Sequence, residues 1–341
     1  MDAICKEIEL QKDFLKENKI DSIYFGGGTP SVLEKNELKK IFASFEKYFT
    51  WDKNAEITFE CNPDDLTKEK LEELKALGVN RLSIGLQSFD DTELKWMNRL
   101  HTAAESLACV KLAQEIGFKN ISIDLIYGSK FQTVESWKKT LEKALSLNVQ
   151  HISSYNLTVE EKTELGQAVA KGKELAVDDE KSSQQFIVLM DTLSKNGFEH
   201  YEISNFAQKG FEAVHNTNYW KGAKYLGIGP SAHSFNGAAR QWNISNNAIY
   251  VNAINSNTDF FETETLSKLN RYNEYVLTRL RTKWGCDINY IKTEFGNIFA
   301  EHFTETSEAF IPNDLQKENS NYSLTKMGKL MADKIAMELF M

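Results

Sequence analysis

The chain has 341 residues, enough for one large core and a smaller appended domain. Its 40 basic and 49 acidic residues give a net charge of −9, which argues against a nucleic-acid-binding stripe and against a polybasic membrane anchor. No apolar run approaches the roughly 20 residues of a membrane span, and the acidic N-terminal stretch does not resemble a signal peptide. We therefore expect a cytoplasmic protein that works on small molecules or proteins.

The first two hundred residues alternate β-rich segments with amphipathic helices. The predicted strands are 22–25, 56–60, 81–86, 120–126, 151–156 and 200–203. The predicted helices are 2–18, 35–48, 68–77, 103–116, 134–147 and 180–195. This alternation predicts a parallel sheet, either open or curled into a (β/α) barrel, with its ligand site at the carboxyl ends of the strands.

The chain opens on a helix rather than a strand, so we expect an incomplete barrel that lacks its first strand. The sheet should then begin at 22–25 and leave an unpaired edge there. The predicted domains are a partial barrel over 1–208, a glycine- and aromatic-rich connecting segment over 209–260, and a small, mostly helical domain over 261–341. Within the connecting segment, 245–260 is expected to be a polar linker. Helices at 267–281 and 287–295, and an extended piece leading into a last helix at 322–340, suggest a winged-helix shape.

Polar groups follow several predicted strands. The first strand runs into GGGTP, whose glycines let a ligand approach the main chain closely. Glu60 and Asp124 lie where apolar strands meet their loops, and Gln87 follows Gly85. The guanidinium of Arg99 can donate two parallel hydrogen bonds to a carboxylate. A ligand with an ammonium, a carboxylate and two vicinal hydroxyls satisfies all four side chains, and S-adenosylmethionine carries those groups. For any one of these residues a plain structural role is the better explanation, whereas for the whole set in this order a shared ligand site is.

A series of long motifs carries a family resemblance over nearly the whole chain. They are IYFGGGTPSVL, GLQSFDD, IDLIYG, SYNLTVE, YEISNFA, HNTNYW and YLGIGPSAHS. With them the chain resembles the radical S-adenosylmethionine proteins related to oxygen-independent coproporphyrinogen III oxidase, in the HemW heme-chaperone branch. The resemblance implies that the incomplete barrel is of the radical S-adenosylmethionine type.

The resemblance also implies a set of cofactor-binding residues. It places Gly27, Gly28 and Thr29 around the methionyl group of S-adenosylmethionine and Glu60 near its ammonium. Arg99 meets the carboxylate, and Gln87 and Asp124 lie nearer the ribose.

One departure concerns the [4Fe–4S] cluster that the family holds with a CxxxCxxC motif. The four cysteines here, Cys5, Cys61, Cys109 and Cys286, form no such motif, and we expect them to be small buried hydrophobes. Met1 falls inside the family's usual chain, which indicates either a start codon placed too late or a protein without the cluster. The first explanation is favoured, because the downstream cofactor residues are retained. As written, the chain is expected not to cleave S-adenosylmethionine.

The segment HNTNYW, residues 215–220, matches the HNxxYW signature associated with heme in this branch. His215 is a candidate axial ligand, Tyr219 and Trp220 could cover the porphyrin face, and His233 is a second candidate ligand. A hydrogen-bonded loop histidine with two covering aromatic residues explains the motif equally well.

The leading hypothesis is a heme chaperone that delivers heme to acceptor hemoproteins. The alternatives are oxidative decarboxylation of coproporphyrinogen III and a noncatalytic barrel with a vestigial site. We expect no nucleic-acid partner, and a peripheral membrane contact without an anchor stays open, as does the oligomeric state.

Overall fold

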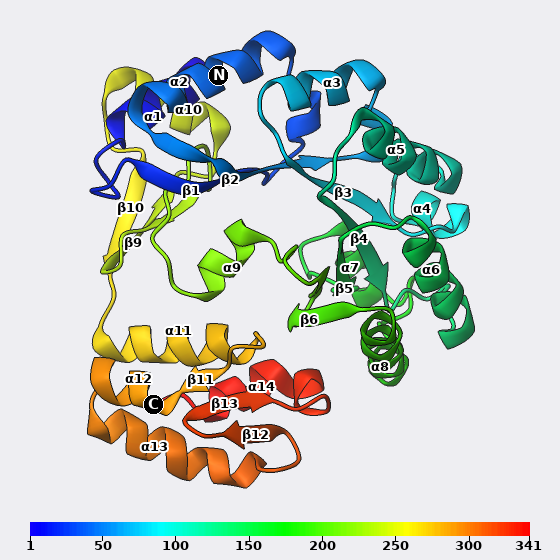
Figure 1. Cartoon of the computed structure of the whole chain (residues 1–341), viewed down its shortest axis with the longest axis vertical. Helices are drawn as coiled ribbons and strands as arrows, with labels where there is room; N and C mark the ends of the chain where they lie inside the picture. Colours follow the sequence, from blue (N-terminus) through cyan, green and yellow to red (C-terminus); the bar gives the residue numbers. More distant parts are fainter. The chain divides into compact units, whose positions relative to one another are not determined.

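The largest sheet of the computed structural model, which describes all 341 residues, has seven strands (Figure 1). Its strand order is β1-β2-β3-β4-β5-β7-β6, so β1 and β6 are its two edges and the sheet is open, as predicted. The strands are β1 Lys19–Phe25, β2 Thr50–Cys61, β3 Arg81–Gln87, β4 Ile121–Tyr127, β5 His151–Asn156, β6 Phe198–Glu202 and β7 Asn205–Gln208. Strands β2 to β5 pair in parallel.

The chain divides into two compact units. Unit 1 comprises Met1–Ile23, Leu33–Glu56 and Ala213–Met341, and unit 2 comprises Tyr24–Val32 and Ile57–Glu212. The helices of unit 2 are α3 Lys68–Ala76, α4 Asp91–Trp96, α5 Ala103–Ile116, α6 Val134–Ser146, α7 Glu164–Ala170 and α8 Asp179–Lys195. The three-segment domain division expected from the sequence stays a prediction.

In unit 2 the strands have two chemically distinct faces, because successive side chains of a strand point to opposite sides. On one face lie apolar side chains that are fully buried: Leu82, Ile84, Ile121, Ile123 and Ile152. The opposite face carries polar residues at the alternate positions: Arg81, Ser83, Ser122, Asp124, His151 and Ser153. A buried polar face of this kind is a place for a polar ligand rather than for core packing.

One of the predicted elements of unit 2 needs correction. The last predicted strand, 200–203, does not join the parallel ladder. Instead β6 and β7 form an antiparallel hairpin, and β7 inserts between β5 and β6. The four residues of β7 are too few to show a pattern in the sequence.

Unit 1 contains the first helices and everything after Glu212. Its helices are α1 Asp2–Leu10, α2 Lys35–Tyr48, α9 Val214–Trp220, α10 Asn247–Ser256, α11 Lys268–Leu280, α12 Ile288–Glu294, α13 Asn297–Ser307 and α14 Ala332–Glu338. The first helix ends at Leu10, well before the predicted residue 18. The expected linker 245–260 instead holds α10, which Asn246 caps through its side chain and which ends at Asn257 in the left-handed region, with φ at 53°. Strands β8 His233–Phe235, β9 Ala239–Asn243 and β10 Phe261–Thr265 form a small antiparallel sheet.

In the C-terminal region the helices and strands follow one another in the order typical of a winged helix, as predicted. After α11 come β11 Cys286–Asp287, then α12 and α13, and then the hairpin of β12 Leu315–Glu318 and β13 Asn321–Leu324. The three strands form one antiparallel sheet in the order β11-β13-β12. The sequence did not predict α13.

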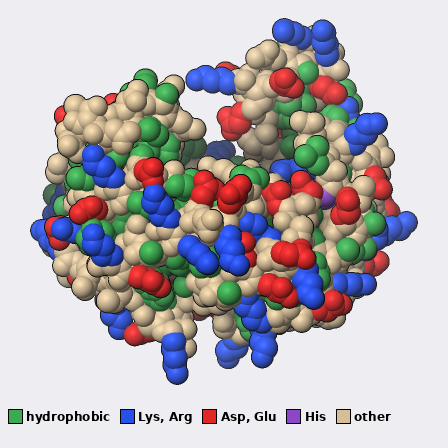
Figure 2. All heavy atoms as spheres, turned by 90° about the horizontal axis from the view of Figure 1, so that it is seen from above, with side chains coloured by type: hydrophobic (Ala, Val, Ile, Leu, Met, Phe, Trp, Pro, Cys, Tyr) green, Lys and Arg blue, Asp and Glu red, His purple; other side chains and the backbone are tan.

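The surface carries charges of both signs, in agreement with the 40 basic and 49 acidic residues of the sequence. In the space-filling view, basic and acidic side chains are interspersed and apolar side chains occur in small groups (Figure 2). No helix has the length and apolarity needed to cross a bilayer.

Candidate functional site

The glycine loop after β1 is open on its ligand side. Gly26 to Thr29 are exposed, and a Cβ added to Gly27 or Gly28 meets no atom within 4 Å. Gly27 has a φ of 77°, which favours glycine. Gly26 is tightly packed instead, since a Cβ there lies 2.7 Å from the carboxyl carbon of Glu60. The loop therefore presents open main chain beside a carboxylate.

Glu60 is oriented by two donors. The Tyr24 hydroxyl donates a 2.5 Å hydrogen bond to Oε1, and the Gly27 N–H donates to Oε2 at 3.3 Å. Burial, together with the charge of Glu60, raises the pKa of Tyr24, so the phenol stays protonated and remains the donor. The sequence analysis missed Tyr24.

Asp124 lies on the same polar face and towards the same end of the sheet. Burial raises the pKa of its carboxyl to about 6, although Ser153, Arg81 and Ser83 act in the opposite direction. The charge of Glu60 also raises this pKa, and the strand register places the two carboxylates on the same face of the sheet, two strands apart. The Oδ1 atom of Asp124 is buried and has no hydrogen-bond partner within the chain. An acceptor left unsatisfied in this way suits a ligand hydroxyl.

Gln87 reaches the polar face by an unusual backbone turn. Its φ is 65°, which is uncommon for a side-chain-bearing residue, and the pairing of β3 with β4 shifts register between Ile84 and Gln87. The amide nitrogen of Gln87 lies 2.7 Å from where a Cβ of Gly85 would stand. The glycine therefore leaves the space that Gln87 occupies, and the strained backbone is a sign of a functional position.

Arg99 lies beyond α4, and only its main-chain N–H is engaged, in a 2.9 Å hydrogen bond to the Leu94 carbonyl. The structure shows no ion pair of its guanidinium. The structure thus places Glu60 and Asp124 on one face of the sheet, and it places Gln87 and the glycine loop at the ends of their strands. The position of the Arg99 guanidinium relative to these groups rests on the sequence resemblance.

A second polar layer continues deeper along the same face. His151 Nδ1 is 2.7 Å from Ser122 Oγ, and its Nε2 is 2.7 Å from the Tyr201 hydroxyl. Burial, reinforced by the charge of Arg81, holds the pKa of His151 well below its usual range. None of these residues was a sequence candidate. The alternating polar residues of RLSIGLQ, ISIDLIY and HISSYN are the signal that could have found them.

The loops after β3 and β4 are joined by a buried carboxylate. Glu93 accepts hydrogen bonds from Ser88 Oγ, Ser129 Oγ at 2.9 Å and Gln132 Nε2 at 3.2 Å. Since Ser88 and Ser129 each follow a strand end by one or two residues, this cluster holds the two strand-end loops together.

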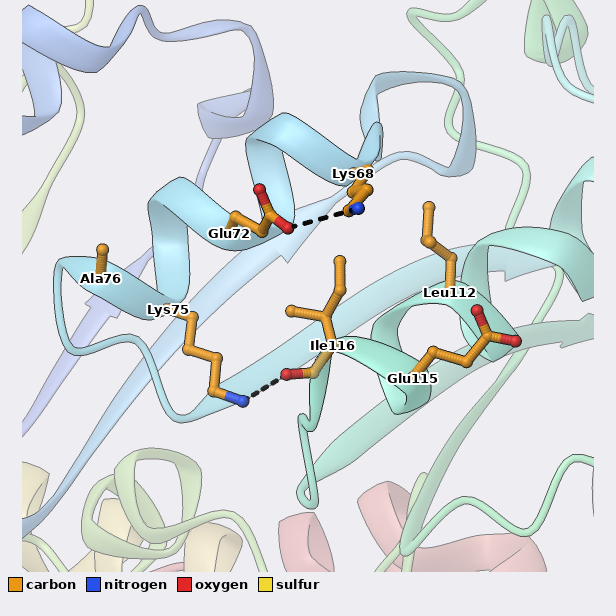
Figure 3. A pocket seen from close by; sticks show the side chains of 7 residues that line it. All are labelled: Lys68, Glu72, Lys75, Ala76, Leu112, Glu115 and Ile116. Carbon is orange, nitrogen blue, oxygen red and sulfur yellow. Dashed lines mark hydrogen bonds and ion pairs between the residues drawn. The ribbon is translucent and has the colours of Figure 1, made fainter.

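A separate groove lies between α3 and α5, on the helical side of unit 2 (Figure 3). Lys68, Lys75, Leu112 and Glu115 are among its lining residues, and Lys75 donates a hydrogen bond to the Ile116 carbonyl. Its wall is mostly formed by exposed side chains on two helix surfaces. None of the strand-end residues lines it, so we do not assign the function there.

The residues present fit S-adenosylmethionine but do not fit an iron–sulfur cluster. An open glycine loop, an oriented carboxylate and an unsatisfied buried acceptor match the methionyl ammonium and the ribose hydroxyls of this molecule. No group of three metal-ligating side chains occurs in the structure. Cys61 and Cys109 are buried, and burial raises the pKa of the Cys109 thiol to about 12. Such thiols are poor sources of the thiolates that a cluster needs.

The HNTNYW segment forms α9 in unit 1. The main-chain N–H groups of Val214 and His215 donate to the Glu56 carboxylate at 2.9 and 3.0 Å, which satisfies the start of the helix. His215 Nδ1 lies 2.9 Å from Ser22 Oγ. A hydrogen bond on one ring nitrogen is the usual way in which a metal-binding histidine is oriented.

Aromatic rings continue from His215. Its ring centroid is 5.3 Å from that of Tyr219, which in turn lies 4.2 Å from the ring of Tyr225. Tyr219 is 41% exposed, so this row reaches the surface of unit 1. His233 is exposed, and its ring lies 6.5 Å from that of Trp242, so it has no such aromatic row beside it.

An open, largely parallel half-barrel with polar strand ends defines a protein of the radical S-adenosylmethionine fold class. The Radical SAM superfamily model matches residues 4–144. The heme chaperone HemW of Lactococcus lactis is 32% identical over 99% of this chain and 90% of the relative, and HemW of Bacillus subtilis is 32% identical over 93% and 84%. The chain belongs to the HemW family. In fold it is similar to the coproporphyrinogen III oxidase HemN of Escherichia coli, with a TM-score of 0.85 and 24% identity over 99% of this chain and 82% of that one.

Proposed function

We propose that the protein is a heme chaperone that binds heme at α9 and passes it to acceptor hemoproteins. The observation that carries this proposal is His215, oriented through Nδ1 by Ser22 and followed one helical turn later by the half-exposed ring of Tyr219. In this arrangement His215 would supply an imidazole nitrogen to the iron, and Tyr219 and Trp220 would supply aromatic surface for the porphyrin.

We further propose that unit 2 binds S-adenosylmethionine at its strand ends. When bound, this molecule supplies an adenosyl group activated by its sulfonium. Glu60 holds the ammonium, Arg99 the carboxylate, and Gln87 and Asp124 the ribose, while Gly27, Gly28 and Thr29 lie along the methionyl group. The two donors on Glu60 and the orphaned acceptor of Asp124 support this proposal.

The oxidase alternative has weaker support. The relatives that match nearly the whole chain at 30% identity or more are named heme chaperones, and the similarity to HemN at 24% identity extends to the fold alone. A cytoplasmic location and contact with hemoproteins fit the chaperone proposal, and both stay predictions.

A heme-transfer experiment tests the function. The protein is loaded with hemin, passed through a gel-filtration column and mixed with an apo-hemoprotein that has a distinct Soret band. We expect the parent to retain heme through the column and to release it to the acceptor. His215→Ala should elute largely heme-free, whereas Gln87→Ala should behave like the parent. A parent protein that elutes without heme, or that never passes it on, contradicts the proposal.

A further inference from the structure

Gln87 lies at the centre of a three-residue turn at the end of β3. The Ser88 N–H donates a 2.8 Å hydrogen bond to the Leu86 carbonyl, and Gln87 between them has a φ of 65°. A turn closed in this way around a positive φ is rare, and it is strained when the central residue carries a side chain. Such a conformation persists only where the surrounding structure holds it.

The turn places the Gln87 amide on the polar face of the sheet. Gly85 occupies a position of β3 that faces this side, and the Gln87 amide nitrogen lies 2.7 Å from where a Gly85 Cβ would stand. Because Ile84 pairs with Ile123, the next residues of the two strands are Gly85 and Asp124. The Gln87 amide therefore takes the place of a missing side chain in the same row as the Asp124 carboxylate.

A buried carboxylate holds the residue that follows Gln87. Ser88 is fully buried, and its hydroxyl donates to Oε2 of Glu93, which is itself 3% exposed. The Ser88 oxygen also accepts the Asp90 N–H at 3.1 Å, and Ser129 donates to the other oxygen of Glu93 at 2.9 Å. Since burial removes competing water, the charge-assisted bond from Ser88 to Glu93 fixes this side of the turn.

A buried histidine holds the residue that precedes Gln87. His101 is 3% exposed, and its Nε2 lies 3.2 Å from the Leu86 carbonyl oxygen. Because a carbonyl can only accept, Nε2 carries the proton and donates. The Leu86 carbonyl thus accepts a second hydrogen bond besides the one that closes the turn. Both sides of the turn are held by residues of the segment 93–101, which also carries Arg99.

We propose that Glu93 and His101 are positioning residues that hold Gln87 in its strained turn, so that its amide already faces the place of the ribose hydroxyls before S-adenosylmethionine binds. This proposal rests on the proposed binding of S-adenosylmethionine by unit 2 and adds the residues that preorganise it. A side chain that is held in its bound conformation loses less conformational entropy on binding, which raises affinity. Glu93 and His101 act through Gln87 rather than by contact with the ligand.

The test is a double-mutant cycle on the affinity for S-adenosylmethionine, measured by isothermal titration calorimetry. Ser88→Ala is used in place of Glu93→Ala, because it removes a single hydroxyl and leaves the carboxylate its other donors. We expect Ser88→Ala and Gln87→Ala each to weaken binding on the order of tenfold. The double variant should bind no more weakly than Gln87→Ala alone, whereas two independent effects would multiply.

Ser129→Ala is the matched control. It removes an equally buried hydroxyl from the same Glu93 carboxylate, but on the loop after β4 rather than beside Gln87. Urea denaturation should show a cooperative transition for both serine variants, and only Ser88→Ala should lose affinity. His101→Phe, which removes the bond to the Leu86 carbonyl and keeps an aromatic ring, should weaken binding on the order of threefold and add nothing to Gln87→Ala.

The outcomes separate this proposal from the function on which it rests. Parental affinity in Ser88→Ala or in Gln87→Ala, or losses that multiply in the double variant, overturns the positioning role while leaving cofactor binding in place. Equal weakening by Ser129→Ala also overturns it, because the loss then follows from the buried cluster as a whole. A parent that binds no S-adenosylmethionine overturns the proposed binding, and this inference with it.

Discussion

The Tyr24 hydroxyl donates a 2.5 Å hydrogen bond to Glu60 Oε1, which joins the end of β1 to the end of β2 in unit 2. The approach of Gly26 to both side chains leaves no room for a Cβ between them. Tyr24, Gly26 and Glu60 therefore act as one group, in which the phenol and the loop main chain hold the carboxylate in place.

Replacing Tyr24 with Phe should weaken binding of S-adenosylmethionine roughly tenfold, because a charge-assisted hydrogen bond that orients Glu60 is lost. Isothermal titration calorimetry on the parent and on Tyr24→Phe gives the comparison. Tyr48→Phe, a change on α2 in unit 1, is the control and should bind as the parent does. Unchanged affinity in Tyr24→Phe means that Glu60 needs no help from the phenol.

Asp124 should make stability depend on pH in a specific direction. Its folded pKa of about 6 lies above the ordinary aspartate value of 3.8, so its contribution is most favourable below about 3.8 and is lost as the pH rises through about 6. At higher pH the buried charge of Asp124 destabilises the folded state by at most about 3 kcal/mol, and Asp124→Asn removes this cost. Urea denaturation should show a gain in stability for Asp124→Asn at about pH 8 and little gain at about pH 4. Asp259→Asn, a change at an exposed position, should leave the stability unchanged at both pH values. An equal gain in stability for Asp124→Asn at both pH values would rule out titration of Asp124 as the cause.

The alternation of strands and helices in unit 2 could be predicted from the sequence because the local patterns agree with the tertiary structure. Helix α5 begins at the capping residue Thr102 and stops at Gly117, whose φ is 96°, and its bounds match the prediction. The hairpin of β6 and β7 could not be predicted, since which strand lies beside β5 is decided by packing rather than by local pattern. For α10, polar composition concealed a helix whose buried face includes Tyr250 and Ile254.

The candidate site was only partly accessible from sequence. Glu60, Asp124 and Gln87 stood out because each ends or interrupts an apolar segment. Tyr24 and Arg81 did not, because a tyrosine or arginine within a strand usually belongs to an edge or a surface. The burial of Arg81 becomes evident only when the polar faces of β2 to β5 are aligned in register.

Glu7 should be essential for the stability of unit 1. This fully buried carboxylate accepts hydrogen bonds from the Gly229 N–H at 2.7 Å, from Asn243 Nδ2 at 2.6 Å and from the Tyr250 hydroxyl. Glu7→Ala removes the acceptor shared by three buried donor groups, of which Asn243 Nδ2 keeps only its bond to the Gly229 carbonyl, and should lower the free energy of unfolding by about 3 kcal/mol. Exposed Glu9→Ala on the same helix should change it by less than about 0.5 kcal/mol. Thermal melts that show equal losses for the two variants would refute the role of Glu7.

Anaerobic reconstitution with iron and sulfide should leave this chain without a stoichiometric [4Fe–4S] cluster. Cys61, Cys109 and Cys286 are buried, and burial raises the pKa of each thiol. Iron and sulfide analysis after gel filtration provides the measurement, and Cys5→Ser should give the same low values as the parent. Four irons per chain would mean that the cysteines converge in solution.

The most direct test of the central claim is an absorbance titration of the apoprotein with hemin, carried out on the parent, His215→Ala and His233→Ala. We expect one heme per parent chain, with a Soret band shifted as for an axial imidazole. His233→Ala should reproduce both the band and the affinity, whereas His215→Ala should bind more weakly with a different Soret maximum. A His215→Ala protein that matches the parent in both respects would contradict heme binding at α9.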